Sequence, residues 1–328
     1  MPKDLIITSG NSRYDLLLRR FVWSLRHEGE FTGDIIICDN DVAGTWDQPG
    51  KASDQPSFTE DSTVFFKDLQ VTVIPYVGLL QENDILRETI DQLPSATQRY
   101  PHKFVYTALI SKRYPDYNRI CYMDSDILIQ APVQALFDAM NGPGIFIGPE
   151  NQPIGKNGYL SQWIRHTQFG GLSDQKQYEA TMDGSLNLCT GLFGGTGRDF
   201  HRFCLLNLVL ASNQFIRFYS DQPSVNILTS FFGYPLNLLN SGHVVHLGDI
   251  YAEDISVSNG QIMYQSTIPV AVHFNGGSRN WYDILFPDGG HVRSDFSHHW
   301  SLKGRMEKKL KRWLVLIYSK TILNFKRK

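Results

Sequence analysis

Short apolar runs alternate with longer segments of helical spacing over the first 150 residues. The runs that predict β-strands cover residues 5–8, 34–38, 71–75, 119–123 and 145–148. Apolar residues spaced as in helices cover residues 14–28, 85–93 and 103–112. Strands that alternate with helices predict a doubly wound, mostly parallel α/β sheet. Between them, residues 43–63 are rich in Gly, Pro, Ser and Asp and predict a long surface loop.

Polar side chains stand where three of these strands end. Thr8 and Ser9 close the first run, Asp39 follows the second, and an acidic triplet follows the run 119–123. In doubly wound sheets, ligands bind beyond the carboxyl ends of the strands. We therefore expect these side chains to line one site.

The acidic triplet is Asp124-Ser125-Asp126, which lies between two apolar runs. Two carboxylates placed between buried segments cost free energy unless something compensates their charge. A divalent cation with oxygen ligands is one such compensation. The alternative is an ordinary turn, in which an Asp side chain caps its own backbone. The apolar flanks and a histidine motif downstream favour the metal.

The downstream motif begins at His273 and reads His-Phe-Asn-Gly-Gly-Ser-Arg-Asn-Trp. It follows the apolar run 268–272, so we expect His273 at a strand end. A neutral imidazole is a good manganese ligand beside carboxylates. Gly276 and Gly277 allow the backbone to approach a phosphate, and Arg279 supplies a permanent cation. An isolated histidine at a strand end is more often an ordinary polar residue, but these neighbours favour a ligand.

The formal charge of −2 conceals an asymmetry along the 328 residues. Residues 303–328 carry ten Lys/Arg and one Glu, about +9, which leaves 21 Lys/Arg and 32 Asp/Glu, about −11, for the rest. An acidic body argues against nucleic-acid binding. In the tail, basic residues flank the apolar run 313–318, as is typical of an interfacial helix on anionic lipid. The alternative is a last helix packed on the body with solvated lysines.

The four cysteines form no Cys-x-x-Cys pair, and each lies in or beside an apolar run. They are Cys38, Cys121, Cys189 and Cys204. We expect buried thiols in a reducing compartment. The first residues predict a strand rather than a signal peptide, and no run has membrane-spanning length. These features predict a cytoplasmic protein, peripheral on the inner face of the membrane if the tail binds lipid.

The motifs together resemble those of the family-8 glycosyltransferases, retaining enzymes of the GT-A fold. That family pairs Asp-x-Asp with a late His-x-x-Gly-x-x-Lys-Pro-Trp, in which Arg279 and Asn280 of this chain replace Lys and Pro. The segment from Asp221-Gln222 to Asn226 is similar to the family's Asp-Gln…Asn segment. The resemblance extends over roughly residues 4–285.

The resemblance implies a Rossmann-like, mostly parallel sheet flanked by helices. Residues 1–302 would form the GT-A domain, with a nucleotide-binding half at 1–148 and an acceptor-side half at 149–302. Residues 303–328 would form a basic amphipathic tail. Within the second half, residues 149–185 are interpreted as an insertion that covers a substrate.

The resemblance also implies roles for single residues. Asp124, Asp126 and His273 would hold Mn²⁺, or Mg²⁺, against the donor diphosphate. Asp221 and Gln222 would be catalytic, with Gln222 below the anomeric carbon. The residues expected to bind the donor are Thr8, Ser9, Tyr14, Lys103, Asp124, Ser125, Gly191, Gly276, Gly277 and Arg279. Alternatives remain open for the roles of two residues. Tyr14 could pack on the body of the protein, and Asp221 could be a helix N-cap before Gln-Pro.

The predicted function is metal-dependent, retaining transfer of a hexose from UDP-glucose or UDP-galactose. The acceptor would be a hydroxyl of a glycan or glycolipid, as in the assembly of cell-surface polysaccharide or lipooligosaccharide. The alternative is a GT-A protein that binds sugar nucleotides, or a nucleotidyltransferase. The latter usually has a Gly-rich basic loop after the first strand, which residues 9–13 match poorly. A dinucleotide-binding G-x-G-x-x-G is absent after that strand.

Overall fold

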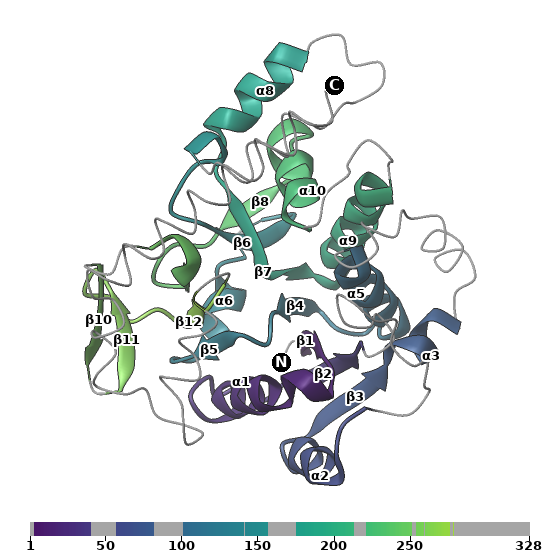
Figure 1. The fold of residues 1–328 in the computed structure, drawn as a ribbon. Helices are drawn as coiled ribbons and strands as arrows, with labels where there is room; N and C mark the ends of the chain where they lie inside the picture. Colours follow the sequence, from purple (N-terminus) through teal and green to yellow (C-terminus); the bar gives the residue numbers. More distant parts are fainter. Residues whose placement is uncertain are drawn as a thin grey trace, which may run out of the picture.

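A computed structural model describes residues 3–40, 57–81, 101–140, 142–156, 175–212, 221–250, 254–258, 260–275 and 278 of the chain. Its centre is a seven-stranded sheet in the order β3-β2-β1-β4-β7-β6-β8 (Figure 1). The strands are β1 (Asp4–Gly10), β2 (Asp34–Asp39), β3 (Val71–Pro75), β4 (Arg119–Met123), β6 (Ile145–Pro149), β7 (Leu188–Thr196) and β8 (Leu236–Leu238). All neighbours are parallel except β7, which is antiparallel to both β4 and β6. The predicted mostly parallel α/β sheet is confirmed.

A smaller sheet continues from the end of β4. It contains β5 (Ile127–Ile129), β12 (Ala271–His273) and β9 (Val244–His246), with β12 in the middle. β12 is antiparallel to β5 and parallel to β9. A separate hairpin consists of β10 (Ile255–Ser258) and β11 (Gln261–Tyr264). The small sheet brings the late part of the chain beside the segment that follows β4.

Helices cover both faces of the central sheet. The α-helices are α1 (Asp15–His27), α2 (Glu60–Asp68), α3 (Tyr76–Gln81), α5 (Pro101–Arg113), α6 (Gln134–Asp138), α8 (Gln175–Gly184), α9 (Gly197–Ser212) and α10 (Gln222–Asn226). The short turns are η1 (Ser12–Tyr14), η3 (Ile154–Lys156), η5 (Leu247–Asp249) and the π-helical η4 (Ile227–Phe231). None of these helices, within the described residues, is long and apolar enough to span a bilayer.

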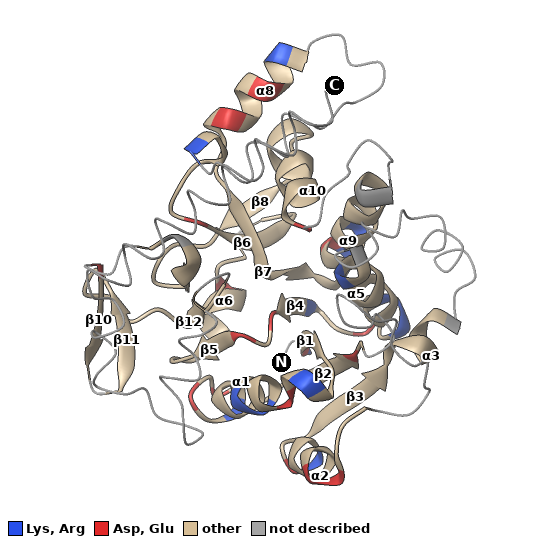
Figure 2. Cartoon of the chain, in the orientation of Figure 1, with Lys and Arg blue, Asp and Glu red and all other residues tan. Residues whose placement is uncertain are grey.

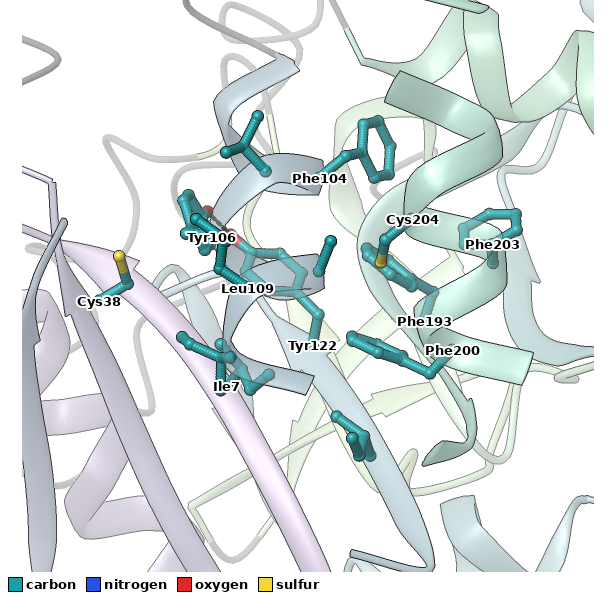
Figure 3. Close-up of a cluster of buried hydrophobic side chains, with 14 of the residues drawn as sticks. Ile7, Cys38, Phe104, Tyr106, Leu109, Tyr122, Phe193, Phe200, Phe203 and Cys204 are labelled. Carbon is teal, nitrogen blue, oxygen red and sulfur yellow. Dashed lines mark hydrogen bonds between the residues drawn. The ribbon is translucent and has the colours of Figure 1, made fainter. Parts of the chain in front are cut away.

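Successive residues of the central strands pack into two different cores. In β1, Leu5 and Ile7 join the core beneath α5 and α9, whereas Ile6 joins the core beneath α1. Figure 3 shows the first core, in which Phe104 of α5 faces Phe203 of α9. Strands buried on both faces explain why the sequence shows continuous apolar runs rather than strict alternation. The four cysteines are buried and free, as predicted.

The element boundaries follow the sequence closely over the first half. The runs 71–75 and 119–123 coincide with β3 and β4, while β1 continues two residues past its predicted end. The predicted loop 43–63 is wrong at its end, because Thr59 caps α2 by accepting a hydrogen bond from the Ser62 backbone N–H. The insertion predicted at 149–185 contains η3 and α8. The predicted helix at 85–93 and the tail lie outside the described residues.

Candidate active site

The acidic triplet bridges the two sheets. Met123 ends β4 and Ile127 begins β5, so Asp124 and Asp126 occupy the short turn between them (Figure 2). The Asp124 backbone N–H donates to the Gly191 carbonyl over 2.7 Å, and the Phe274 N–H donates to the Asp126 carbonyl over 3.0 Å. Backbone contacts to β7 and to the end of β12 therefore fix the triplet in place.

His273 closes a group of potential metal ligands with both aspartates. Its Nε2 lies 3.2 Å from Asp126 Oδ1 and 3.7 Å from Asp124 Oδ2. One ligand atom from each of the three residues lies within 4.8 Å of the others. His273 Nε2 is buried and forms no hydrogen bond with any described residue, although carboxylate oxygens face it. A nitrogen and two carboxylate oxygens around one point are a donor set suited to Mn²⁺ or Mg²⁺. The residues fit the predicted cation.

The other nitrogen of the His273 ring faces a second histidine. His273 Nδ1 lies 3.0 Å from His246 Nδ1 in the neighbouring strand β9, and 3.5 Å from Cys189 Sγ. Burial, with His273 adding to it, lowers the pKa of His246 well below its usual range, so His246 is a neutral acceptor. A histidine that ligates through Nε2 carries its proton on Nδ1, and His246 is placed to accept that proton's hydrogen bond.

Cys189, His246 and His273 also lie close enough together to be considered as metal ligands. Burial raises the pKa of the Cys189 thiol well above its usual range. Mn²⁺ and Mg²⁺ prefer oxygen ligands to sulfur, so for such a cation the group with two carboxylates on the other side of His273 is the better site.

Lys103 of α5 links Asp124 to the predicted Asp221-Gln222 segment. Its Nζ lies 3.2 Å from Asp124 Oδ1 and 2.7 Å from Asp221 Oδ2. Burial opposes the charge on Lys103, but the two carboxylates outweigh it and hold the pKa of Lys103 above its usual range. Burial likewise opposes ionisation of Asp221, yet the charge and hydrogen bond of Lys103 lower its pKa. Asp221 occupies the N-cap position of α10, as the alternative predicted, but its side chain makes no capping hydrogen bond there.

A chain of hydroxyl groups connects the end of β1 to the acidic turn. Ser9 Oγ lies 2.6 Å from Tyr106 Oη, and Tyr106 donates to Tyr122 Oη over 3.2 Å. Tyr122 in turn donates to Asp124 Oδ1 over 2.7 Å. The Asp124 carboxylate is therefore held by the Tyr122 hydroxyl and the Lys103 ammonium, and not by a hydrogen bond to the backbone of its own turn.

Gln222 lies in a cluster of amides around a buried carboxylate. Its Nε2 donates to Glu150 Oε1 over 3.1 Å and to Asn187 Oδ1 over 3.0 Å. Asn187 Nδ2 donates to Glu150 Oε2 over 2.6 Å, and Asn275 Nδ2 donates to Glu150 Oε1 over 3.2 Å. Glu150 directly follows β6 and is 9% exposed.

The remaining residues that were predicted to bind the sugar donor differ in how far they are buried. Thr8 is fully buried within β1, so its side chain has no exposed surface to offer a ligand. Ser125 is 9% exposed, whereas Tyr14 is 38% exposed at the end of η1. Gly191 lies in β7 against the His273 ring. Three predicted phosphate ligands lie outside the described residues: Gly276, Gly277 and Arg279.

Sequence reasoning missed three polar residues of this site. Glu150 lies two residues past the predicted strand 145–148 and directly follows the observed β6, so the strand-end rule that found Asp124 was the signal for it. Asn275 lies inside the histidine motif. His246 ends the apolar pair Val244-Val245 as His273 ends its own run, but only strand pairing places the two side by side.

No family model and no curated protein sequence matches this chain. Solved structures do resemble it. Galactosyltransferase LgtC, in complex with donor and acceptor sugar analogues, is 16% identical with a TM-score of 0.50 over 83% of this chain and 87% of that one. Mouse xyloside xylosyltransferase 1 is 13% identical with a TM-score of 0.53 over 84% and 98%. The bifunctional glycosyltransferase WbbM is 10% identical with a TM-score of 0.54 over 92% and 52%.

At these identities the likeness concerns the fold. The order of the central sheet, the reversed strand β7 and the acidic turn after β4 are the features that the site depends on. The resemblance predicted from the motifs is confirmed at the level of the fold: this chain shares the fold of the solved glycosyltransferases LgtC and xyloside xylosyltransferase 1.

Proposed function

We propose that this protein is a metal-dependent, retaining glycosyltransferase that moves a hexose from a UDP-sugar to a hydroxyl of a glycan or glycolipid. The observation that carries the proposal is the convergence of Asp124, Asp126 and His273, which come from distant parts of the chain. If residues 124–126 formed only a turn, nothing would explain why the buried His273 Nε2 faces the carboxylates of Asp124 and Asp126 without forming a hydrogen bond. A cation that also binds the donor diphosphate accounts for all three side chains.

In the proposed reaction, the bond between the anomeric carbon and the diphosphate oxygen breaks, and its electron pair leaves with UDP. The acceptor oxygen bonds to the anomeric carbon on the same face, and its proton passes to the departing diphosphate. A bound Mn²⁺ would act as a Lewis acid for the charge on that diphosphate. Lys103 lies between Asp124 and Asp221 and holds their carboxylates close together, so the start of α10 lies beside the cation group.

The proposed role of Gln222 is to place its carbonyl oxygen near the sugar carbon that gains positive charge. One solved structure of LgtC is an active-site variant in which glutamine is replaced by glutamate, so a glutamine lies in the active site of that enzyme. The position of Gln222 at the start of α10, next to Asp221 and its Lys103 partner, supports the same role here.

Part of the proposal concerns location. We infer that the protein works on the cytoplasmic side of a membrane and that residues 303–328 meet anionic lipid. The ten Lys/Arg of that segment, set beside a short apolar run, support the inference. A lipid-linked acceptor would suit this arrangement.

The test is a transfer assay on the full chain with a panel of UDP-sugars, with and without Mn²⁺, read as release of UDP and of labelled hexose. We expect Mn²⁺-dependent turnover with one donor and its loss in Asp126→Asn, which removes one ligand charge. The exposed Asp116 supplies the control, because Asp116→Asn changes the same charge away from the site. Binding of UDP-sugars without turnover would favour the alternative of a sugar-nucleotide-binding protein, and full activity of Asp126→Asn in chelator would refute the metal site.

A further inference from the structure

The carboxylate of Glu150 determines which end of each neighbouring amide faces it. Its two oxygens accept hydrogen bonds from the amide nitrogens of Gln222, Asn275 and Asn187, at 3.1, 3.2 and 2.6 Å. A carboxylate offers only acceptors, so an amide beside it must present its NH₂ group and not its carbonyl oxygen. The orientation of the three amides therefore follows from the charge of Glu150.

Independent contacts agree with these orientations. Asn275 Oδ1 accepts a hydrogen bond from the Gly248 backbone N–H, which leaves its NH₂ group to face Glu150. Asn187 Oδ1 accepts from Gln222, while its own NH₂ group donates to Glu150. The Glu150 N–H also donates to the Asn187 carbonyl over 2.7 Å, which ties the end of β6 to the start of β7.

Gln222 is the residue whose orientation matters most for the proposed reaction. Its NH₂ group donates to both Glu150 and Asn187, so its carbonyl oxygen is directed away from Glu150. A flipped amide has nearly the same shape but presents N–H groups where the oxygen had been. Near a carbon that gains positive charge, this exchange would turn a stabilising dipole into an opposing one.

We propose that Glu150 is a positioning residue for transfer, which acts by holding the Gln222 amide with its carbonyl oxygen toward the sugar. The proposal rests on the proposed function, because it assumes that Gln222 lies beside the anomeric carbon. In this proposal Glu150 acts on the reaction through its hydrogen bond with Gln222. A double-mutant cycle isolates that coupling from the contacts of Glu150 with Asn187 and Asn275.

The first experiment compares Glu150→Gln, Gln222→Ala and the double variant in steady-state transfer. Glu150→Gln keeps the size of the side chain but also offers N–H donors, so the Gln222 amide loses its preferred orientation. We expect kcat to fall about tenfold or more, because a transition-state interaction is lost, while the donor KM stays within about twofold. On the Gln222→Ala background, Glu150→Gln should lower kcat no further.

The control is Asp199→Asn at the start of α9. Asp199 Oδ2 also accepts two hydrogen bonds, from the Gly144 N–H and from Thr196 Oγ1, but it contacts none of the residues of the site described above. We expect Asp199→Asn to leave kcat within about twofold of wild type, as independent sites do. If Glu150→Gln fails to unfold cooperatively, Glu150→Asp replaces it, because the shorter carboxylate keeps the charge but withdraws from Gln222.

A second readout does not depend on turnover. In protein labelled with ¹⁵N-glutamine, the Gln222 side-chain NH₂ signal is identified by its absence in Gln222→Ala. We expect its hydrogen exchange to be slow in wild type and fast in Glu150→Gln. Equal kcat in wild type and Glu150→Gln, or an equal loss on the Gln222→Ala background, would overturn the positioning role. Absence of turnover in wild type, with the protected NH₂ signal present, would instead refute the proposed function.

Discussion

Replacement of Gly191 by alanine should displace His273 without changing the chemistry of any proposed ligand residue. A Cβ built on Gly191 would lie 2.0 Å from His273 Cε1 and 2.7 Å from Nε2. Carbon atoms in ordinary contact are about 3.5 Å apart, so the ring must retreat by about 1.5 Å. The backbone of β7 has little freedom to move instead, because it pairs with β4 on one side and β6 on the other.

A shift of this size exceeds what a metal site tolerates. Ligand distances vary by about 0.2 Å around their preferred values, so a ring displaced by about 1.5 Å no longer ligates the same cation. Loss of a partner that merely orients a ligand costs about 10–100-fold in affinity, and displacement of the ligand itself should cost at least the upper figure. We therefore expect Gly191→Ala to weaken Mn²⁺ binding by about 100-fold or more.

The assay is titration of Mn²⁺ in the presence of UDP, with free Mn²⁺ read from its electron paramagnetic resonance signal. Thermal unfolding reports whether the variant still folds, since overpacking of this kind costs about 1–3 kcal/mol. Gly184→Ala is the matched control, because a Cβ at Gly184 meets nothing within 4 Å. Wild-type Mn²⁺ affinity in a folded Gly191→Ala protein would show that His273 does not bind the cation.

Two further outcomes follow from the contacts of the site, and a third follows from the sequence of the tail. His246→Phe removes the acceptor 3.0 Å from His273 Nδ1 and should lower Mn²⁺ affinity about 10–100-fold in the same titration, whereas unchanged affinity would mean that His246 does not orient the ligand. Lys103→Met leaves the carboxylates of Asp124 and Asp221 without the lysine ammonium and should lower the free energy of unfolding, measured in urea, by about 3–5 kcal/mol. A loss below about 1 kcal/mol would contradict these ion pairs. Deletion of residues 303–328 should abolish co-sedimentation of the protein with anionic liposomes and should leave its co-sedimentation with neutral liposomes unchanged. Undiminished binding to the anionic liposomes would refute the membrane role of the tail.

The central sheet was predictable because its signal is local. The strands β1, β2 and β4 are continuous apolar runs buried on both faces, and polar residues follow or end these runs at one edge of the sheet. The same logic predicted that Asp124 and His273 stand at strand ends, which the structure confirms. It failed for Thr8, because β1 continues to Gly10 and keeps Thr8 inside the sheet.

What the sequence did not reveal depends on pairing between distant segments. His246 and His273 occupy matching positions of two parallel strands, a register that neither strand encodes by itself. Asp221 is the N-cap residue of α10, as Gln-Pro after it predicts, yet its carboxylate pairs with a lysine from α5 and makes no capping hydrogen bond. A tertiary ion pair can override a local capping preference, since the buried lysine would otherwise lack compensation for its charge.

The two aspartates of the cation site are held by different means, and this difference has consequences. Asp126 directly precedes Ile127, which pairs with His273 in the β5–β12 ladder, and the Asp126 carbonyl accepts from the N–H of Phe274, the residue after β12. The ladder therefore fixes the backbone of Asp126 beside that of His273, and the turn at Asp126 lets its carboxylate approach His273 Nε2. The backbone of Asp124 is likewise tied to a strand, because its N–H donates to the Gly191 carbonyl of β7, but its carboxylate is placed by two side chains, Tyr122 and Lys103. The direction of the Asp124 carboxylate can therefore be changed through these two partners without breaking a backbone contact of either sheet.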